Sequence, residues 1–181
     1  MSTQTDPPSI TTLPQISYLD ENGKLPATLS GKIGIYAIFD QAKLLQFVGY
    51  SRDVYLSLKQ HLVRQPQSCY WLKVQTIEKP NRTILENTMN SWIAENGATP
   101  AGNDADKAKW TEAIDVKPLM LDEEKANYEK VAGEEFAQSK VLKNVARRVE
   151  AEILETLKSR GCQEEIRFNP KLKDSGLLDL K

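Results

Sequence analysis

The sequence predicts an α/β fold, in which a small three-stranded, mainly antiparallel sheet is combined with helices. Runs rich in β-branched and aromatic residues at 32–39 and 44–49 are separated by four mostly polar residues, which is typical of a β-hairpin. A helical repeat follows the second run, and the alternating segment 69–78 predicts a third strand. With a second helix after it, residues 32–97 are predicted to form strand, strand, helix, strand and helix.

Capping residues set the expected helix boundaries. Ser51 is a candidate N-cap for the first helix, whose apolar residues recur every four positions. These residues are Val54, Leu58 and Leu62. The second helix, within residues 81–97, is predicted to begin at Asn81 or Thr83 and to end at Gly97.

The C-terminal part of the chain is richer in charge and predicts mostly helix. Residues 121–136 are acidic and helix-prone, and an amphipathic helix extends from about Glu134 to Arg160. Its apolar stripe consists of Leu142, Val145, Val149, Ile153 and Leu157. The last stretch, which contains a proline and a glycine, is predicted to be extended.

These elements divide the chain into three predicted parts. Residues 1–30 are rich in Pro, Thr, Ser and Asp without sustained periodicity, which indicates a mostly disordered leader. Residues 31–103 form the predicted α/β domain. After a break rich in Pro, Gly, Asn and Asp, residues 104–181 form a helical extension with an extended tail.

Composition narrows the classes of function. The net charge of -1 provides no overall positive field for a polyanion, so any nucleic-acid contact has to rest on a local patch. Cys69 and Cys162 lie far apart without C-x-x-C spacing, which indicates reduced thiols. His61 is the only histidine, so a histidine-rich metal site is excluded. Without a signal segment or an apolar run of roughly 18 residues, we expect a soluble, cytoplasmic protein.

Two short triplets in the hairpin carry a resemblance to a known family. Residues 34–36 read GIY, and residues 47–49 read FVG where YIG would complete the pattern. With the order of elements around them, residues 31–103 resemble the GIY-YIG nuclease domain. The C-terminal segments "WTEAIDVKP" and "NPKLKDSGLLDLK" are also similar to those of uncharacterised GIY-YIG-like proteins of oxygenic phototrophs.

The resemblance implies a mechanism for cutting phosphodiester bonds. Two tyrosines would position and deprotonate the attacking water, and an arginine on the first helix would stabilise charge on the phosphate. A glutamate on the later helix would bind one divalent metal, expected to be Mg²⁺. Tyr36 matches the first tyrosine, Glu86 matches the metal ligand, and His61 also recurs in the domain that the chain resembles.

Two positions depart from the family's pattern. Phe47 stands where the second tyrosine is expected, and a phenyl ring can neither donate nor carry a proton. Ser57 stands at the arginine position and offers no guanidinium. Arg64, on the same helix face two turns on, could lean over part of the gap, whereas Arg52 points elsewhere on the helical wheel.

Two functions therefore stay open. The first is a catalytically impaired, GIY-YIG-like pseudoenzyme that binds a nucleic acid or a protein partner and holds Mg²⁺ weakly. The alternative is an active Mg²⁺-dependent endonuclease that hydrolyses DNA or RNA. Basic residues that could contact nucleic acid are Arg52, Arg64, Lys140, Lys143 and Arg147. The sequence leaves the oligomeric state open.

Overall fold

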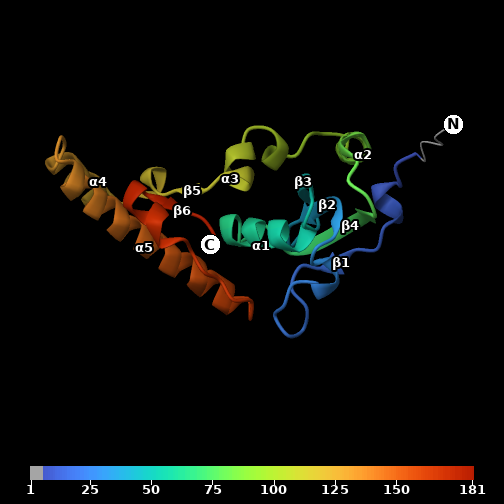
Figure 1. The fold of residues 1–181 in the computed structure, drawn as a ribbon, viewed down its shortest axis with the longest axis horizontal. Coiled ribbons are helices and arrows are strands. Elements are labelled where there is room, and N and C mark those ends of the chain that lie inside the picture. The colour runs from blue at the N-terminus through green and yellow to red at the C-terminus, as the bar shows by residue number, and fades with distance from the viewer. Residues whose placement is uncertain (1–5) are drawn as a thin grey trace. The chain divides into compact units, whose positions relative to one another are not determined.

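The computed structural model describes residues 6–181, which divide into two compact units (Figure 1). One unit ends at Thr111, and the other begins at Glu112. The first unit extends beyond the predicted domain end at residue 103, because Trp110 stacks against Phe47 of the sheet. The predicted functional division at 103/104 stays a prediction.

A four-stranded antiparallel sheet forms the middle of the first unit, with the strand order β1-β4-β2-β3. The strands are β1 (Ile16–Ser17), β2 (Ile33–Phe39), β3 (Leu45–Ser51) and β4 (Trp71–Ile77). The structure thus confirms the α/β class. It corrects the number of strands, because Ile16 and Ser17 of the predicted leader pair with β4.

Three α-helices accompany this sheet within the described part of the first unit. They are α1 (Val54–Arg64), α2 (Arg82–Glu95) and α3 (Lys107–Thr111). Short 3-10 turns lie at η1 (Ile10–Thr12), η2 (Ala27–Leu29) and η3 (Ala101–Asn103). Asn81 caps α2 as predicted, but Asp53 rather than Ser51 caps α1, since the Asp53 carboxylate accepts the Leu56 N–H.

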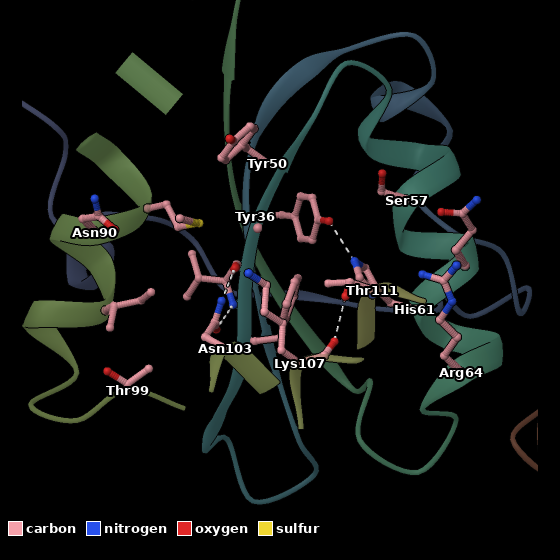
Figure 2. A pocket seen from close by; sticks show the side chains of 16 residues that line it. Tyr36, Tyr50, Ser57, His61, Arg64, Asn90, Thr99, Asn103, Lys107 and Thr111 are labelled. Atoms are coloured by element: carbon pink, nitrogen blue, oxygen red, sulfur yellow. Dashed lines mark hydrogen bonds between the residues drawn. The ribbon is translucent and has the colours of Figure 1, made fainter. Parts of the chain in front are cut away.

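The two long helices cover opposite faces of the sheet. Ile35, Ala37 and Val48 pack against Leu85 and Trp92 of α2. Successive side chains on a strand point to opposite faces, so Tyr36 points the other way, where its hydroxyl meets His61 of α1. Figure 2 shows α1 and α2 on either side of the strands.

Residues 6–30 belong to the first unit and are packed against its sheet and helices instead of forming the predicted disordered leader. Tyr18 and Leu25 are fully buried, and the Tyr18 hydroxyl donates a hydrogen bond to the carbonyl of Leu58. The indole of Trp92 donates to the carbonyl of Pro8 at 2.9 Å. The apolar residues of this segment pack into the core, although its Pro- and Thr-rich composition predicts disorder. Residues 1–5 of the predicted leader lie outside the described residues.

The hairpin register differs by two residues from the predicted one. Tyr36 pairs with Gly49, and Phe47 pairs with Ile38, whereas pairing around the four polar residues predicts Tyr36 opposite Phe47. The pairing is irregular next to Ile38, and Lys43 adopts a positive φ of 65° in the turn. Because a shift of two residues preserves the face, Tyr36 and Phe47 still lie on the same side.

The second unit is built on one long helix. Its helices are α4 (Asp122–Lys130), α5 (Glu135–Ser159) and the 3-10 turns η4 (Lys117–Leu119) and η5 (Pro170–Ser175). Strands β5 (Ile114–Asp115) and β6 (Leu177–Leu178) form a second, two-stranded sheet. The predicted apolar stripe of α5 is buried at Leu142, Val145, Val149, Ile153 and Leu157.

The C-terminal tail was predicted to be extended. The structure corrects this prediction, because the 3-10 turn η5 interrupts the tail. Asn169 accepts the N–H of Lys171 and a proline opens the turn, which together start a helix-like segment. Among residues 6–181, no helix has the length and apolar character that crossing a membrane requires.

Candidate functional site

A pocket of about 630 Å³ lies in the first unit beside β3, one of the two edge strands of the sheet (Figure 2). Side chains from β2, β3, α1, α2 and the segment 99–111 line it. The pocket therefore reaches around the free edge of the sheet from the α1 side to the α2 side. A pocket of this volume suits a small-molecule ligand.

A buried polar pair forms one wall of the pocket. Tyr36 is 3% exposed and His61 is 4% exposed, and the Tyr36 hydroxyl lies 2.7 Å from Nε2 of His61. Figure 2 shows the two side chains pointing toward each other from β2 and α1. The Tyr36 hydroxyl and Nε2 of His61 satisfy each other, which offsets part of the cost of removing both from water, whereas Nδ1 of His61 is buried without a hydrogen-bond partner among the described residues.

Burial keeps both members of this pair uncharged. It raises the pKa of Tyr36 far above its ordinary value, an effect that the Ser57 hydroxyl and the Arg64 charge partly oppose. Burial is the main reason that the pKa of His61 falls to about 3, and the positive charge of Arg64 lowers it further. The backbone carbonyl of Trp110 acts in the opposite direction and raises this pKa. A phenol and a neutral imidazole are therefore the species present at neutral pH, and they add no charge to the pocket.

Aromatic rings close the floor beside the polar pair. The ring of Phe47 stacks on Trp110 with centroids 5.2 Å apart and an interplanar angle of 2°. It also lies 4.7 Å from the His61 ring and 6.2 Å from the Tyr36 ring, between centroids. The phenyl ring at position 47 thus has a packing role of its own.

Gly49 leaves the space that the Tyr36 ring occupies. A Cβ at this position would lie 2.6 Å from Cε1 of Phe47 and 2.8 Å from the Tyr36 hydroxyl oxygen. Such distances are too short for carbon, so a larger residue would displace the polar pair. The glycine of the second triplet is therefore required by packing.

Asn103 of η3 closes the edge of β3 at the pocket. Its Oδ1 accepts the N–H of Val48 at 2.8 Å, and its Nδ2 donates to the carbonyl of Val48 at 2.7 Å. One side-chain amide thus makes both hydrogen bonds that a neighbouring strand would make.

The charged groups at the pocket are both positive. Arg64 and Lys107 line it, and no acidic side chain belongs to the lining that the structure describes. Nη1 of Arg64 donates to the carbonyl of Trp110 at 3.1 Å, which fixes the guanidinium at the end of α1. The pocket is therefore suited to an anionic ligand.

Glu86, the predicted metal ligand, lies on the other side of the sheet from Tyr36. It belongs to α2, where it forms an ion pair with Arg82 at 2.7 Å and accepts a hydrogen bond from Tyr50 at 3.2 Å. The hydrogen bond from Arg82 holds its pKa below the usual range. Glu86 thus has a cation as its neighbour and does not converge with the other predicted site residues.

The remaining predicted residues of the first unit are divided between two places. Ser57 lines the pocket, and its hydroxyl donates to Ser51 at 2.7 Å. Arg64 also lines it, as described above. Arg52 lines a separate hollow next to Pro80 and Arg82.

The predicted basic strip belongs to α5 of the second unit. Lys140 lies over the ring of Phe136, Lys143 forms an ion pair with Asp174 at 3.5 Å, and Arg147 is exposed. Two of these three side chains therefore have neighbours within their own unit. Binding of nucleic acid by this strip stays an untested prediction.

Sequence reasoning missed several residues that shape the pocket. Gln60, Asn90, Thr99, Lys107 and Thr111 line it without having been candidates. Nothing in their local pattern could identify them, because they come from three helices and a loop that only the fold brings together. Asn103 is an exception, since an asparagine after Pro and Gly in "TPAGN" is a recognisable backbone-binding residue.

Neither cysteine belongs to the pocket lining. Cys69 is fully buried, and its Sγ lies 3.5 Å from the carbonyl of His61. Cys162 is partly exposed and follows the end of α5 in the second unit. Neither cysteine forms a disulfide within the described residues.

The chain is similar to a curated protein, although it matches no family model. The chain is 35% identical over 96 residues to a bifunctional monothiol glutaredoxin of the chloroplast of Arabidopsis thaliana. The match covers 49% of this chain and 33% of that relative, so the chain spans about a third of the relative's length.

These findings overturn the resemblance to GIY-YIG nucleases. The relative is named for glutaredoxin chemistry, in which thiols and disulfides are exchanged, and no nuclease family model matches. Both functions that the resemblance implied are therefore wrong, namely the impaired nuclease-like pseudoenzyme and the active endonuclease. The structure agrees in one respect, because Glu86 lies away from Tyr36.

The expectation of weakly bound Mg²⁺ is corrected as well. The relative's name points to thiol chemistry, which uses no Mg²⁺. Within residues 6–181, no three His, Cys, Asp or Glu side chains gather in a way that could hold a metal ion. The carboxylate of Glu86 is already paired with Arg82.

Proposed function

We propose that this chain binds a small anionic thiol compound of the glutathione class in the pocket of its first unit, as a binding module of a thiol-redox system. The observation that carries the proposal is the charge of the pocket: Arg64 and Lys107 are both cationic, and the described lining contains no acid. The relative named a bifunctional monothiol glutaredoxin supports the redox setting.

The positions of the thiols favour binding over catalysis. A reactive cysteine needs an accessible sulfur and a positive environment that stabilises the thiolate. Cys69 is buried, and Cys162 follows the C-terminal end of α5, where the helix dipole disfavours a negative charge. The described sheet pairs are all antiparallel, so the β-α-β unit that accompanies a C-x-x-C redox motif does not occur among them.

The reacting thiol would therefore come from a partner protein, and this chain would hold the small thiol compound for it. A bifunctional relative three times the length of the match has room for a separate redox domain. Two cysteines that form no disulfide within the described residues fit a reducing compartment, such as the cytoplasm or a plastid stroma.

The ligand would be held by charge at one end and by neutral polar groups along its length. Lys107 and Arg64 would attract carboxylates, and Gln60 and Asn90 offer amides to a peptide backbone. Tyr36 and His61 form a fixed neutral wall, since the Tyr36 hydroxyl and Nε2 of His61 are hydrogen-bonded to each other.

Calorimetric titration with glutathione tests the proposal. The parent should bind it saturably, and Lys107→Gln should weaken binding at least about tenfold, since a hydrogen bond to a charged group contributes about 1.5–3 kcal/mol. Lys109→Gln is the matched control, because Lys109 lies on the same helix, pairs with Asp106 and does not line the pocket. Absence of binding by the parent, or equal affinities for both variants, would contradict the proposal.

A further inference from the structure

An exposed aromatic side chain stands at the beginning of α5 in the second unit. Phe136 is 76% exposed, more than any other large apolar side chain described. The ammonium of Lys140, one turn further along the helix, lies 4.8 Å from the centroid of its ring. A single exposed apolar residue is ordinary on a protein surface, so the neighbourhood of Phe136 has to carry the argument.

That neighbourhood contains a hollow of about 630 Å³ directly beside the ring. Phe136 forms one side of it, Tyr128 of α4 and Leu142 of α5 contribute further apolar surface, and Ser175 belongs to η5. A hollow of this volume accommodates a phenyl ring. The surface thus presents a protruding ring and a recess for one next to each other.

Charges of both signs surround the ring and the recess. Glu135 and Asp174 line the hollow. Lys140 lies outside the lining, beside Phe136. Asp174 already forms an ion pair with Lys143 at 3.5 Å, whereas Glu135 forms no ion pair among residues 6–181.

We propose that this surface is where a second copy of the chain binds, with Phe136 of each copy entering the hollow of the other. A two-fold interface uses the same patch on both molecules, so it requires a patch that is complementary to itself. Phe136 beside the hollow meets this requirement in shape, and the base Lys140 next to Phe136 together with the acid Glu135 in the lining of the hollow meets it in charge. The proposal is independent of the pocket in the first unit.

Sedimentation of the full chain, followed from about 1 µM to about 1 mM, tests this inference. The parent should change from monomer to dimer over this range. Phe136→Ser should raise the dissociation constant at least tenfold, as truncation of a central aromatic anchor does, corresponding to about 1.4 kcal/mol. Leu154→Ser is the matched control: Leu154 is partly exposed on the same helix, does not line the hollow and should leave the dimer unchanged.

A charge exchange tests the proposed contact between Lys140 and Glu135 of the two copies. Lys140→Glu should weaken the dimer by repulsion, and the double variant Lys140→Glu with Glu135→Lys should restore it. Because both side chains are exposed, neither change should impair folding, which circular dichroism would check. A monomer at every concentration, a dimer that Phe136→Ser leaves intact, or a double variant as weak as Lys140→Glu would each overturn the inference.

Discussion

The two faces of the central sheet are packed in different ways. The face under α2 is apolar, with Ile35 and Val48 against Leu85 and Trp92. The face under α1 carries the hydrogen-bonded pair of Tyr36 and His61 among its buried groups. Nδ1 of His61 is buried without a hydrogen-bond partner among the described residues, so this pair contributes less to stability than well-packed apolar side chains of the same volume. The α2 face therefore contributes most to the stability of the fold. The α1 face contains polar groups that packing alone does not require.

The largest expected effect comes from breaking the apolar face. Trp92→Ala should lower the free energy of unfolding by about 3–5 kcal/mol, because a fully buried indole leaves a cavity. Urea denaturation measures this loss. Trp92→Phe is the control that keeps most of the packing and removes only the hydrogen bond to Pro8. A loss of less than about 1 kcal/mol for Trp92→Ala would contradict the assignment of this face as the main core.

A pH dependence distinguishes the polar face from the apolar one. His61 has a folded pKa of about 3, below the ordinary 6.5, so between these values the unfolded chain binds a proton that the folded chain does not. The free energy of unfolding should therefore fall as the pH falls below 6.5, by about 2 kcal/mol at about pH 5.

His61→Gln is the control for this titration, since glutamine can keep a hydrogen bond to Tyr36 and does not titrate. Carboxylates titrate in the same range, so the measure is the difference between parent and variant in urea denaturation at several pH values. Parallel pH profiles for the two proteins would mean that His61 is not buried in its neutral form.

The smallest expected effect concerns the hydroxyl of the polar pair. Tyr36→Phe removes the partner of His61 Nε2 and should cost about 1–2 kcal/mol of stability. Thermal or urea unfolding measures it, and glutathione titration of the same variant shows whether the hydroxyl also matters for binding. A variant more stable than the parent would show that the polar pair destabilises the fold and would contradict this prediction.

Local elements of this fold were predictable, but their arrangement was only partly so. The hairpin, the helix cap at Asn81 and the buried stripe of α5 follow from patterns within a few residues. The register of Tyr36 was not predictable, because it depends on an irregular pairing next to Ile38 and on the positive φ of Lys43. The strand at Ile16–Ser17 is too short to show periodicity.

The candidate site shows the same division. Tyr36, Ser57, His61 and Arg64 were candidates from the sequence, and all four line the pocket. Glu86 was expected with them but lies on the other side of the sheet. The sheet face on which α2 packs depends on the fold of the whole unit and cannot be predicted from the local pattern of the helix.

The glycines of the two triplets, which suggested a nuclease domain, have a structural explanation. A Cβ at Gly34 would lie 2.5 Å from the carbonyl oxygen of Gln75, and one at Gly49 would lie 2.6 Å from Phe47. Both glycines are therefore explained by close packing within the sheet. A glycine pattern of this kind indicates how strands and rings approach each other, and it carries no information about the reaction at the site.

The contact between Asn103 and Val48 has a consequence for how the protein behaves at high concentration. An uncovered outer strand invites strands of other molecules to join it, which leads to uncontrolled assembly. Asn103 occupies the donor and the acceptor at the middle of β3, so an incoming strand would first have to remove it. The same amide that borders the pocket thereby guards the chain against forming continuous sheets with its neighbours.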